Sequence, residues 1–505
     1  MPTKPPRPAP ARFSLGRLAA ACLFVALPLS ACSLAPDYVR PAAPVPDGLT
    51  AGAGRGAASP APEGAPLPGW REFLPEPRLA ALIDAALKNN RDLRAASLRI
   101  LEARAELGMA RAERLPMLEA MAGETAAGGA GRETSRDFEA ALSLPSFEID
   151  YLSRVGDMSR AALERYLGTV EAGRAARLAL VSSVSEAYLS QRLAVERRRL
   201  TARNLASFES SRAFVEGRIV SGQSDMLDLE QARGMAAFAR AQLAAREAEV
   251  VRTGNALSVW LGDFGETELP PPLELLKWPA LQLPAAVRSE TLLARPDVME
   301  AEHMLMASNA DIGAARAAFF PSISLTGNLG VMSMELSSLF GGGNEAWSFG
   351  PRITLPIFSG GRNMANLDLA EVRKDMAVVE YEAAVQTAFR EVKDGLELRS
   401  RLGERLSAQA DYLGTQRRVL ALATNSYLNG AVSYLEVLEA QRNVLEAELE
   451  LLEIKMEQIF NDISLYAALG GGFPDEPESP GDSPPPGPAD PGAAAAATAP
   501  ASARQ

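Results

Sequence analysis

The same order of sequence features occurs twice along this chain of 505 residues. The residues Ala-Arg-Ala at 110–112, followed four residues later by a proline, recur with the same spacing at 315–317. The glycine, leucine and alanine positions of segment 222–232 recur in segment 430–440. A nearly constant offset across unrelated motifs indicates an internal duplication. The length therefore predicts one duplicated architecture and not several unrelated domains.

Each copy is predicted to contain a helix, two strands, a long helix and a shorter helix. Helical stretches are rich in Ala, Leu, Glu and Arg, whereas strand stretches alternate between apolar and small polar residues. In the first copy, residues 70–275, the expected helices are 79–115, 154–219 and 225–261, with a β-hairpin at about 117–149. In the second copy, residues 276–470, the expected long and short helices are 363–428 and 435–469, with a β-hairpin at about 321–358.

The two long helices are too long for a compact globule. At 1.5 Å per residue, about 65 residues extend for about 100 Å. The last helix has apolar residues at alternating spacings of three and four, which is typical of a coiled-coil seam. The seam consists of Leu435, Leu438, Arg442 as the polar member, Leu445, Leu449, Leu452, Met456, Ile459, Ile463 and Tyr466. We expect a rod in which the two shorter helices of a copy, stacked end to end, lie alongside the long one.

The four predicted strands have the length of strands that cross a membrane, which is about 10 residues. One face of each carries small polar residues, as a water-filled lumen requires. Four strands cannot close a barrel, and an open edge in lipid leaves backbone groups unsatisfied. If the strands span a membrane, several copies of the chain must therefore assemble. A soluble β-domain between helices is the alternative reading of the same pattern.

The first 31 residues predict a lipoprotein signal peptide. Four basic residues precede an apolar run of about ten residues, which is too short to span a bilayer as a helix. The sequence Leu29-Ser30-Ala31-Cys32 then resembles a lipobox, in which the cysteine is lipidated and becomes the new N-terminus. Several acyl chains on Cys32 would anchor the chain stably. Ser33, in place of an aspartate, favours the outer membrane.

Two further segments lack the composition of a folded domain. Residues 32–69 are rich in Pro, Gly and Ala and are expected to form a lipidated N-terminal linker. Residues 471–505 carry many prolines, an alanine run and few large apolar side chains. That segment buries too little apolar surface to fold, so we expect a disordered tail.

Composition excludes several functional classes. There are 63 acidic residues and 51 basic residues, a net charge of −12 that argues against nucleic-acid binding. One histidine and two cysteines exclude a His/Cys zinc site and most histidine-based catalytic sets. No phosphate-binding GxxxxGK[ST] loop occurs. We therefore expect no enzyme activity, no metal site and no cofactor.

Several segments resemble lipidated outer-membrane factors of the TolC family, in the branch of OprM and NodT. The resemblance covers about residues 30–470. It is carried by residues 32–46, Trp70, Phe73, Pro77, 82–87, 111–116, 319–325, 355–358, 360–362, 427–430 and 435–442. It implies an α+β membrane protein: a homotrimer with a twelve-stranded transmembrane β-barrel, continued in the periplasm by a long α-helical coiled-coil barrel. It also implies a periplasmic adaptor (membrane fusion protein) and an inner-membrane transporter of the resistance-nodulation-division (RND) type as partners.

The resemblance also implies roles for residues near the helix breaks. Gly222 and Gly430 would lie at the periplasmic tip, where the adaptor docks. The positions that match a periplasmic gate are Tyr427, Glu436, Glu439 and, in the first copy, Asp228. Members of the family often carry aspartate where this chain has the two glutamates. Val432 stands where some relatives have an arginine that ties the gate shut, so the absence of that arginine implies a different latch.

The function that these features favour is a passive exit duct in the outer membrane for a tripartite efflux pump. Three alternatives remain at this level: the outer-membrane duct of a type I secretion system, a non-conducting coiled-coil lipoprotein, and a carboxylate-based periplasmic enzyme. Drugs, metals, lipids and nodulation signals are all cargoes that such ducts export.

Overall fold

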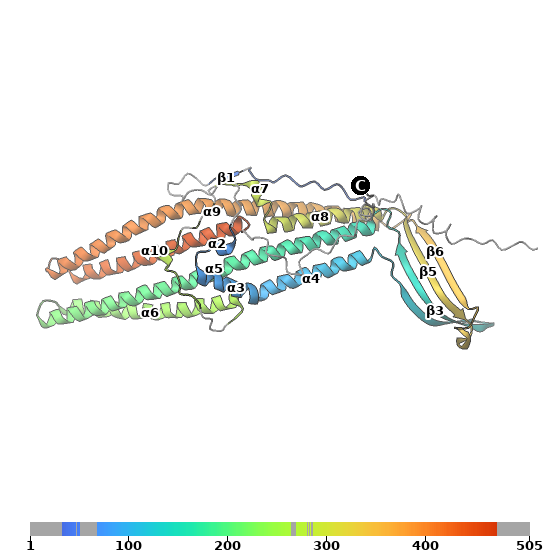
Figure 1. The fold of residues 1–505 in the computed structure, drawn as a ribbon. Helices are drawn as coiled ribbons and strands as arrows, with labels where there is room; N and C mark the ends of the chain where they lie inside the picture. The colour runs from blue at the N-terminus through green and yellow to red at the C-terminus, as the bar shows by residue number, and fades with distance from the viewer. Residues whose placement is uncertain are drawn as a thin grey trace, which may run out of the picture.

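The computed structural model describes residues 33–46, 48–50, 68–263, 269–279, 281, 283 and 286–471. Over these residues the chain forms an elongated rod of helices with a β-sheet at one end (Figure 1). Cys32, the signal segment 1–31 and nearly all of the tail 471–505 lie outside the described residues. None of the helices in the described ranges is both long and apolar enough to cross a lipid bilayer.

The two copies contain matching elements in the same order. The first copy consists of α3 (Pro77–Asn89), α4 (Arg91–Ala112), β2 (Glu119–Gly129), β3 (Arg132–Glu148), α5 (Arg154–Val220) and α6 (Met226–Leu261). The second consists of α8 (Pro296–Ala317), β5 (Ser322–Ser333), β6 (Glu345–Thr354), α9 (Arg362–Leu428) and α10 (Tyr434–Ala468). α5 and α9 each have 67 residues, and α4 and α8 each have 22. Both long helices begin and end within one residue of the expected bounds.

Shorter elements connect these parts. They are β1 (Gly48–Thr50), α2 (Trp70–Phe73), η1 (Leu275–Lys277), β4 (Ala286–Arg288), α7 (Ser289–Leu292) and η2 (Leu336–Ser338). β1 pairs with β4 in a small antiparallel sheet that brings the N-terminal segment to the second copy.

The first predicted helix, residues 79–115, is two helices and not one. Asn90 interrupts it with an extended backbone, at φ −62° and ψ 134°. Its side chain accepts hydrogen bonds from the amides of Asp92 and Leu93, which caps α4. The periodicity of apolar residues continues across the break, and asparagine has a strong N-cap preference that only the local geometry reveals.

The shorter helices stack end to end beside the long ones, as expected. In the first copy, the Asn90 side chain at the start of α4 donates to the carbonyl of Trp260 near the end of α6, at 3.0 Å. In the second copy, the buried Arg295 guanidinium before α8 donates to the carbonyl of Ala468 at the end of α10, at 2.7 Å. α4 and α6 together have 58 residues beside the 67 of α5, and α8 and α10 together have 57 beside the 67 of α9.

The four strands form one antiparallel sheet in the order β2-β3-β5-β6. β3 and β5, from different copies, pair in the middle, and a register shift between Leu144 and Phe147 surrounds Pro145. Proline has no amide hydrogen to donate to the ladder, which accounts for the irregularity. The described sheet ends at β2 on one side and at β6 on the other.

The main hydrophobic core lies in the middle of the rod, where the helices of both copies meet the short elements. Phe73 of α2 stacks on Tyr466 of α10 with ring centroids 4.0 Å apart. The predicted seam of α10 is largely buried: Leu438, Leu452, Ile459, Ile463 and Tyr466 are each less than 5% exposed. Leu435, 46% exposed at the tip of the rod, and Arg442, the polar member, are the exposed positions of the seam.

The N-terminal segment 33–46 is more ordered than its composition indicates. It has no helix, but its side chains and carbonyls contact α5 and α8 over several residues. A segment without periodicity was expected to act as a free spacer. Here hydrogen bonds to α5 and α8 hold the segment in addition to an internal bond from the Ala35 amide to Oγ of Ser33.

Candidate functional site at the helix tips

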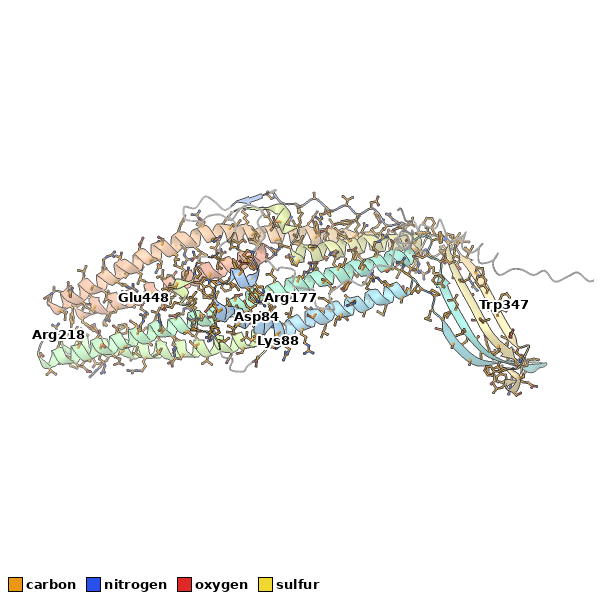
Figure 2. The ribbon with its side chains drawn as sticks, in the orientation of Figure 1. Asp84, Lys88, Arg177, Arg218, Trp347 and Glu448 are labelled. Carbon is orange, nitrogen blue, oxygen red and sulfur yellow. The ribbon has the colours of Figure 1, made fainter. Side chains whose placement is uncertain are left out.

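Two tight turns close the helical hairpins at the end of the rod farthest from the sheet. Figure 2 shows Arg218 at this end and Trp347 at the sheet. Gly222 follows α5 with φ +69°, and Gly430 follows α9 with φ +71°. Each glycine donates its amide three residues back, and the next residue donates five residues back, to Arg218 and Ser426 respectively. This is a left-handed glycine cap, which favours glycine because it has no Cβ.

The two turns differ in how the following helix is capped. Asp225 precedes α6, and its side chain accepts the amide of Asp228 at 2.9 Å. Ser433 precedes α10, and its side chain makes no capping hydrogen bond. The turn between α5 and α6 therefore has an N-cap aspartate, Asp225, whereas the turn between α9 and α10 has no side-chain cap.

Tyr427 connects the tips of the two copies. Its hydroxyl donates to Oδ2 of Asp228 at 3.3 Å and lies 3.3 Å from Oγ of Ser224. Ser224 itself donates to the same Asp228 oxygen at 2.7 Å. The Arg218 guanidinium lies over the Tyr427 ring, 4.8 Å from its centroid. A polar cluster of Arg218, Ser224, Asp228 and Tyr427, called here the tip cluster, thus links α5 and α6 to α9.

Burial raises the pKa of the Tyr427 hydroxyl further above physiological pH, where a tyrosine is already neutral. The side chain is only 7% exposed, and burial is the main cause that raises its pKa, with a further contribution from the Asp228 carboxylate. The Ser224 hydroxyl and the Arg218 charge act in the opposite direction. Tyr427 is therefore a hydrogen-bond donor to a carboxylate, and such charge-assisted bonds are the stronger kind.

A small apolar core supports the tip cluster. The Tyr427 and Tyr434 rings lie 5.3 Å apart in a tilted arrangement. They pack in a cluster whose other buried members come from α5, α6 and α10: Phe208, Val215, Leu229, Ala232, Ala236, Ala239, Val437 and Leu438. Alanine at three positions of α6 lets the helices approach closely, so the hairpins of the two copies meet near the tip.

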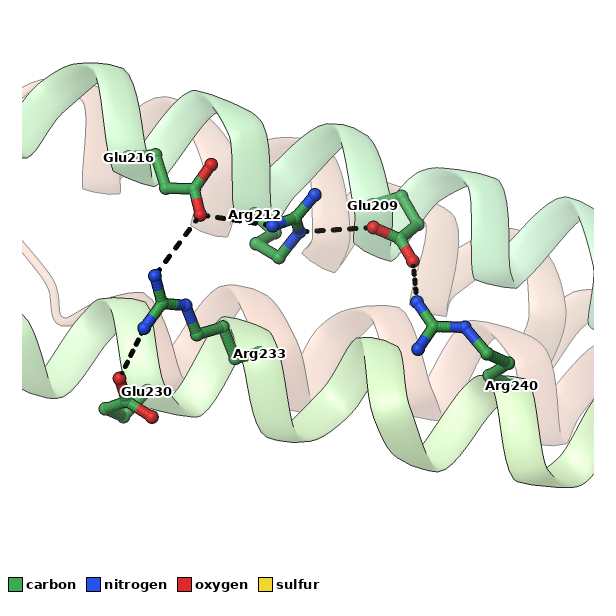
Figure 3. A network of polar contacts seen from close by, with 6 residues as sticks. All are labelled: Glu209, Arg212, Glu216, Glu230, Arg233 and Arg240. Atoms are coloured by element: carbon green, nitrogen blue, oxygen red, sulfur yellow. Dashed lines mark hydrogen bonds and ion pairs between the residues drawn. The ribbon is translucent and has the colours of Figure 1, made fainter.

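Ion pairs tie α5 to α6 beside this core (Figure 3). Arg212 contacts Glu209 and Glu216 on its own helix, both at 3.1 Å. Arg233 of α6 bridges Glu216 of α5 at 3.7 Å and Glu230 at 2.8 Å. Arg240 of α6 pairs with Glu209. Each exposed pair contributes little, but a connected ladder holds the two helices in one register.

The structure separates the predicted gate residues into two groups. Tyr427 and Asp228 are in contact, whereas Glu436 and Glu439 are exposed on α10 and make no described contact with them. Glu439 lines an open groove of about 240 Å³ between α6 and α10, together with Gln231, Gly234, Met235, Leu435, Leu438 and Arg442. Arg218, Ser224 and Tyr434 were not predicted. A basic residue in the last turn of α5 is the signal that points to Arg218.

The described residues contain no group of three or more His, Cys, Asp or Glu side chains able to hold a metal ion. The single histidine, His303, is half-buried on α8, with Nδ1 2.8 Å from Oε2 of Glu164 on α5. This pair joins two packed helices.

Comparisons with known proteins agree with this arrangement. The family described as outer membrane efflux protein matches residues 82–263 and 287–471. The cation efflux system protein CusC of Escherichia coli K12 is 44% identical over 453 residues, which are 89% of this chain and 98% of that protein. The solvent efflux pump outer membrane protein SrpC of Pseudomonas putida is 40% identical over 463 residues, 89% of this chain and 97% of that protein.

A solved structure shows the same fold. The open state of the MtrE outer membrane channel of Neisseria gonorrhoeae superposes with a TM-score of 0.80 at 36% identity, covering 87% of this chain and 98% of that one. The expected localisation and the expectation of a non-catalytic efflux protein agree with these relatives. With two matched segments that cover most of the folded body, this chain belongs to the outer membrane efflux protein family.

Proposed function

We propose that this chain is the passive exit duct of a tripartite efflux pump, and that three copies form a continuous channel. In this proposal the sheet crosses the outer membrane and the helices extend into the periplasm. The observation that supports this proposal is the sheet, which has one mainly apolar face, one mainly polar face and an unpaired strand edge on each side. The sheet continues into a rod whose two outermost helices also expose apolar residues. A non-conducting structural lipoprotein needs no such sheet.

The two faces of the sheet differ in chemistry over most of its length, although Glu124, Arg136 and Glu345 lie on the mainly apolar face at the end far from the helices. Residues directly opposite each other in an antiparallel ladder point to the same face. By this register, one face carries Leu142, Leu144, Ile323, Leu325, Leu329, Trp347, Phe349 and Ile353. The opposite face carries Glu139, Ser143, Ser324, Thr326, Asn328, Ser348, Arg352 and Thr354. Leu329 is 66% exposed and Trp347 77% exposed, which water does not favour but lipid does.

The open edges of the sheet support assembly with further copies. β2 and β6 each present one unpaired edge in the described chain. In lipid, unpaired backbone groups cost several kcal/mol each, so β2 of one copy would pair with β6 of the next. Because the two edges differ, such a head-to-tail contact repeats from copy to copy, and it forms a ring when the rotation between copies closes. Three copies supply the twelve strands that the family resemblance implies.

The helices nearest the sheet also leave two edges available for contact with further copies. They lie in the order α4, α5, α8, α9 (Figure 1). Apolar residues are exposed along both edge helices: Leu98, Leu101 and Met109 on α4, and, at alternating spacings of three and four, Leu369, Val372, Met376 and Val379 on α9. Exposed stripes of this kind seldom persist in a stable monomer. They fit the proposal that α4 packs on α9 of the neighbouring copy.

We further propose that the tip cluster is part of the periplasmic gate. The contact between Tyr427 and Asp228 holds the second hairpin against the first, so its loss would let the α9–α10 tip move outward. Gly222 and Gly430 mark the turns at which a periplasmic adaptor would dock, with an RND transporter beneath it. Glu436 and Glu439, exposed on α10, would form acidic rings in a trimer, and such rings select cations.

Two remaining features complete the proposal. Cys32 would carry the N-acyl and S-diacylglycerol groups that anchor the chain in the outer-membrane lipid. The relatives named above differ in cargo, since CusC is named for cations and SrpC for solvents. We therefore propose that the pump partner, more than the duct, sets the cargo.

Reconstitution tests the function directly. Protein purified in detergent is expected to migrate as a trimer that dissociates on heating, and to conduct ions when added to planar bilayers. Chemical cross-linking before denaturation measures the copy number. A monomer, or a trimer that never conducts, would exclude the exit duct and favour a structural lipoprotein.

A further inference from the structure

The first described residue of the chain is bound to a fully buried carboxylate. Oγ of Ser33 donates to both oxygens of Asp157, each at 2.9 Å. Asp157 lies in the first turn of α5 and is 0% exposed. Its other partner is Arg160, at 3.2 Å. A buried carboxylate requires such partners, because a charge left without them is costly.

Helix α8 contacts the main chain of the next residues. Asn309, itself 6% exposed, donates from Nδ2 to the carbonyl of Pro36 at 2.7 Å. Arg316 donates from Nη1 to the carbonyl of Leu34 at 3.3 Å. Ser33 Oγ in turn accepts the amide of Ala35 at 3.1 Å, which folds the segment into a compact turn. Side-chain and main-chain groups of residues 33–36 are therefore bound together.

Gly313 leaves room for this turn on the surface of α8. A Cβ at this position would lie 2.2 Å from Oδ2 of Asp157 and 2.8 Å from the amide nitrogen of Ala35. Both distances are shorter than any real Cβ contact. Glycine within a helix normally costs stability, so its presence here fits a close approach of another segment.

A second contact holds the segment farther along. Glu302 of α8, 4% exposed, accepts hydrogen bonds from the Tyr38 hydroxyl at 2.9 Å and from Nε and Nη2 of Arg40 at 2.6 and 2.7 Å. Residues 33–40, called here the strap, are thus fixed at two places on the same helix.

We propose that Asp157, Asn309, Gly313 and Arg316 form a docking site for the start of the strap, and that this site fixes where the lipidated N-terminus leaves the folded body. The proposal rests on the proposed lipidation of Cys32, which directly precedes Ser33. Asp157 follows the end of β3 by nine residues, and Gly313 precedes β5 by nine. The docking site therefore lies where the helices join the sheet, at the level at which the sheet would enter the membrane.

Docking of the strap restricts the range of positions that the lipid anchor can reach. A flexible linker with the 38 residues of 32–69 would span about 35 Å on average, which allows the acyl chains to sample many positions. With Ser33 bound, a single peptide bond would connect the proposed lipidation position to a fixed point on the folded body. The acyl chains and the sheet then enter the same leaflet side by side.

Limited proteolysis tests the docking on the mature protein purified from membranes. Chymotrypsin cleaves after exposed tyrosines, and Tyr38 is the tyrosine of the strap. We expect slow cleavage after Tyr38 in the wild type, measured by mass spectrometry of the fragment that begins at Val39. Ser33→Ala and Gly313→Ala each remove or displace contacts to the buried carboxylate, and we expect cleavage at least roughly ten-fold faster in both.

Two controls separate the possible outcomes. Gly403→Ala changes a helical glycine with no atom within 4 Å of the added Cβ, and it should cleave like the wild type. If Gly313→Ala misfolds, Ser33→Ala decides, because it alters only the strap. Equal rates in Ser33→Ala and Gly403→Ala, or fast cleavage in the wild type, would overturn the docking site.

A third chain separates docking from lipidation. In this chain Cys32→Ser is combined with an ordinary cleavable signal peptide, so that the protein is exported without a lipid. Slow cleavage after Tyr38 in this chain supports docking by the protein alone, whereas fast cleavage overturns it. A wild type that takes up no labelled palmitate but keeps Tyr38 protected would refute the lipid anchor and leave the docking site intact.

Discussion

The Tyr427 hydroxyl and Oδ2 of Asp228 lie 3.3 Å apart, although 199 residues separate them in the chain. The contact joins equivalent tips of the two copies, since Asp228 follows Gly222 and Tyr427 precedes Gly430. The same hydroxyl also lies 3.3 Å from Oγ of Ser224, and Gln441 of α10 donates to Ser211 of α5 farther from the turns. The bond from Tyr427 to Asp228 therefore has a strong effect on whether the α9–α10 tip stays beside α5 and α6.

Removal of that hydroxyl is expected to loosen the gate. Tyr427→Phe keeps the ring stacked under Arg218 but leaves Asp228 with Ser224 alone, at a cost of about 1–3 kcal/mol. We expect a higher open probability and larger mean conductance in planar bilayers. Tyr412→Phe, on the exposed surface of the same helix, serves as the control. Equal conductance in both variants would refute the proposal that the bond from Tyr427 to Asp228 holds the gate closed.

The exposed glutamates of α10 are expected to act on ion selectivity through their charge, and not on the contact between Tyr427 and Asp228. Glu436→Ala combined with Glu439→Ala should lower the preference for cations, because a ring of carboxylates attracts them. The reversal potential in a salt gradient measures this preference directly. An unchanged reversal potential would place both glutamates outside the conduction path.

Two glycines near the first tip should respond to alanine with opposite signs. Gly222 has φ +69°, where a Cβ is strained, so Gly222→Ala should destabilise the tip by about 1 kcal/mol. Gly217 lies within α5 with open space around it, so Gly217→Ala should stabilise it by about 0.5–1 kcal/mol. Hydrogen exchange of the amides at the tip measures both changes in local stability. Shifts of the same sign would contradict the turn geometry.

The apolar face of the sheet should reject charge while its polar face accepts it. Leu329→Lys places a cation on the proposed lipid face, at a cost of about 2–4 kcal/mol near the membrane centre. Asn328→Lys, the adjacent residue on the other face, is the matched control. We expect the first variant to yield little heat-resistant trimer in the outer-membrane fraction and the second to yield normal amounts. Similar yields would argue against a membrane-spanning sheet.

Asp462 is expected to make stability fall as pH rises from about 4 to about 6. Burial raises its pKa from 3.8 to about 6, against the charges of Arg399 and Lys455. Since the folded state holds this proton more tightly, ionisation above pH 4 progressively costs stability, on the order of 3 kcal/mol in total. Asp462→Asn should flatten the slope of melting temperature against pH, whereas exposed Asp375→Asn should not. An identical slope in the two variants would disprove the shift.

The helices and their breaks were largely predictable because their signals are local. The start of α5, the end of α9 and the glycine turns at Gly222 and Gly430 follow from periodicity and from the missing Cβ of glycine. The interruption at Asn90 was not predicted, since the apolar pattern runs through it and only the cap geometry distinguishes it. Strand alternation was equally local.

The candidate site was only partly predictable. Tyr427 and Asp228 were both singled out, and the fold brings them together. Ser224 was missed because it does not stand out until α9 is placed beside α5, and Arg218 was missed although it is a basic residue in the last turn of α5. Glu436 and Glu439 were grouped with them on the basis of resemblance. Both are exposed on α10 away from the tip cluster, and their role in the gate stays a prediction.

The sequence by itself determined the duplication, the rod-like helices, the two-faced strands and a cysteine suited to a lipid, since each depends on neighbours along the chain. Only the tertiary structure decided that Tyr427 bonds to Asp228, that α10 buries its seam against both long helices, and that Ser33 docks on Asp157. The first and last of these contacts join residues more than a hundred positions apart, and α10 also packs against α5 of the other copy. Their partners are chosen by how whole helices pack, and no local pattern records that choice.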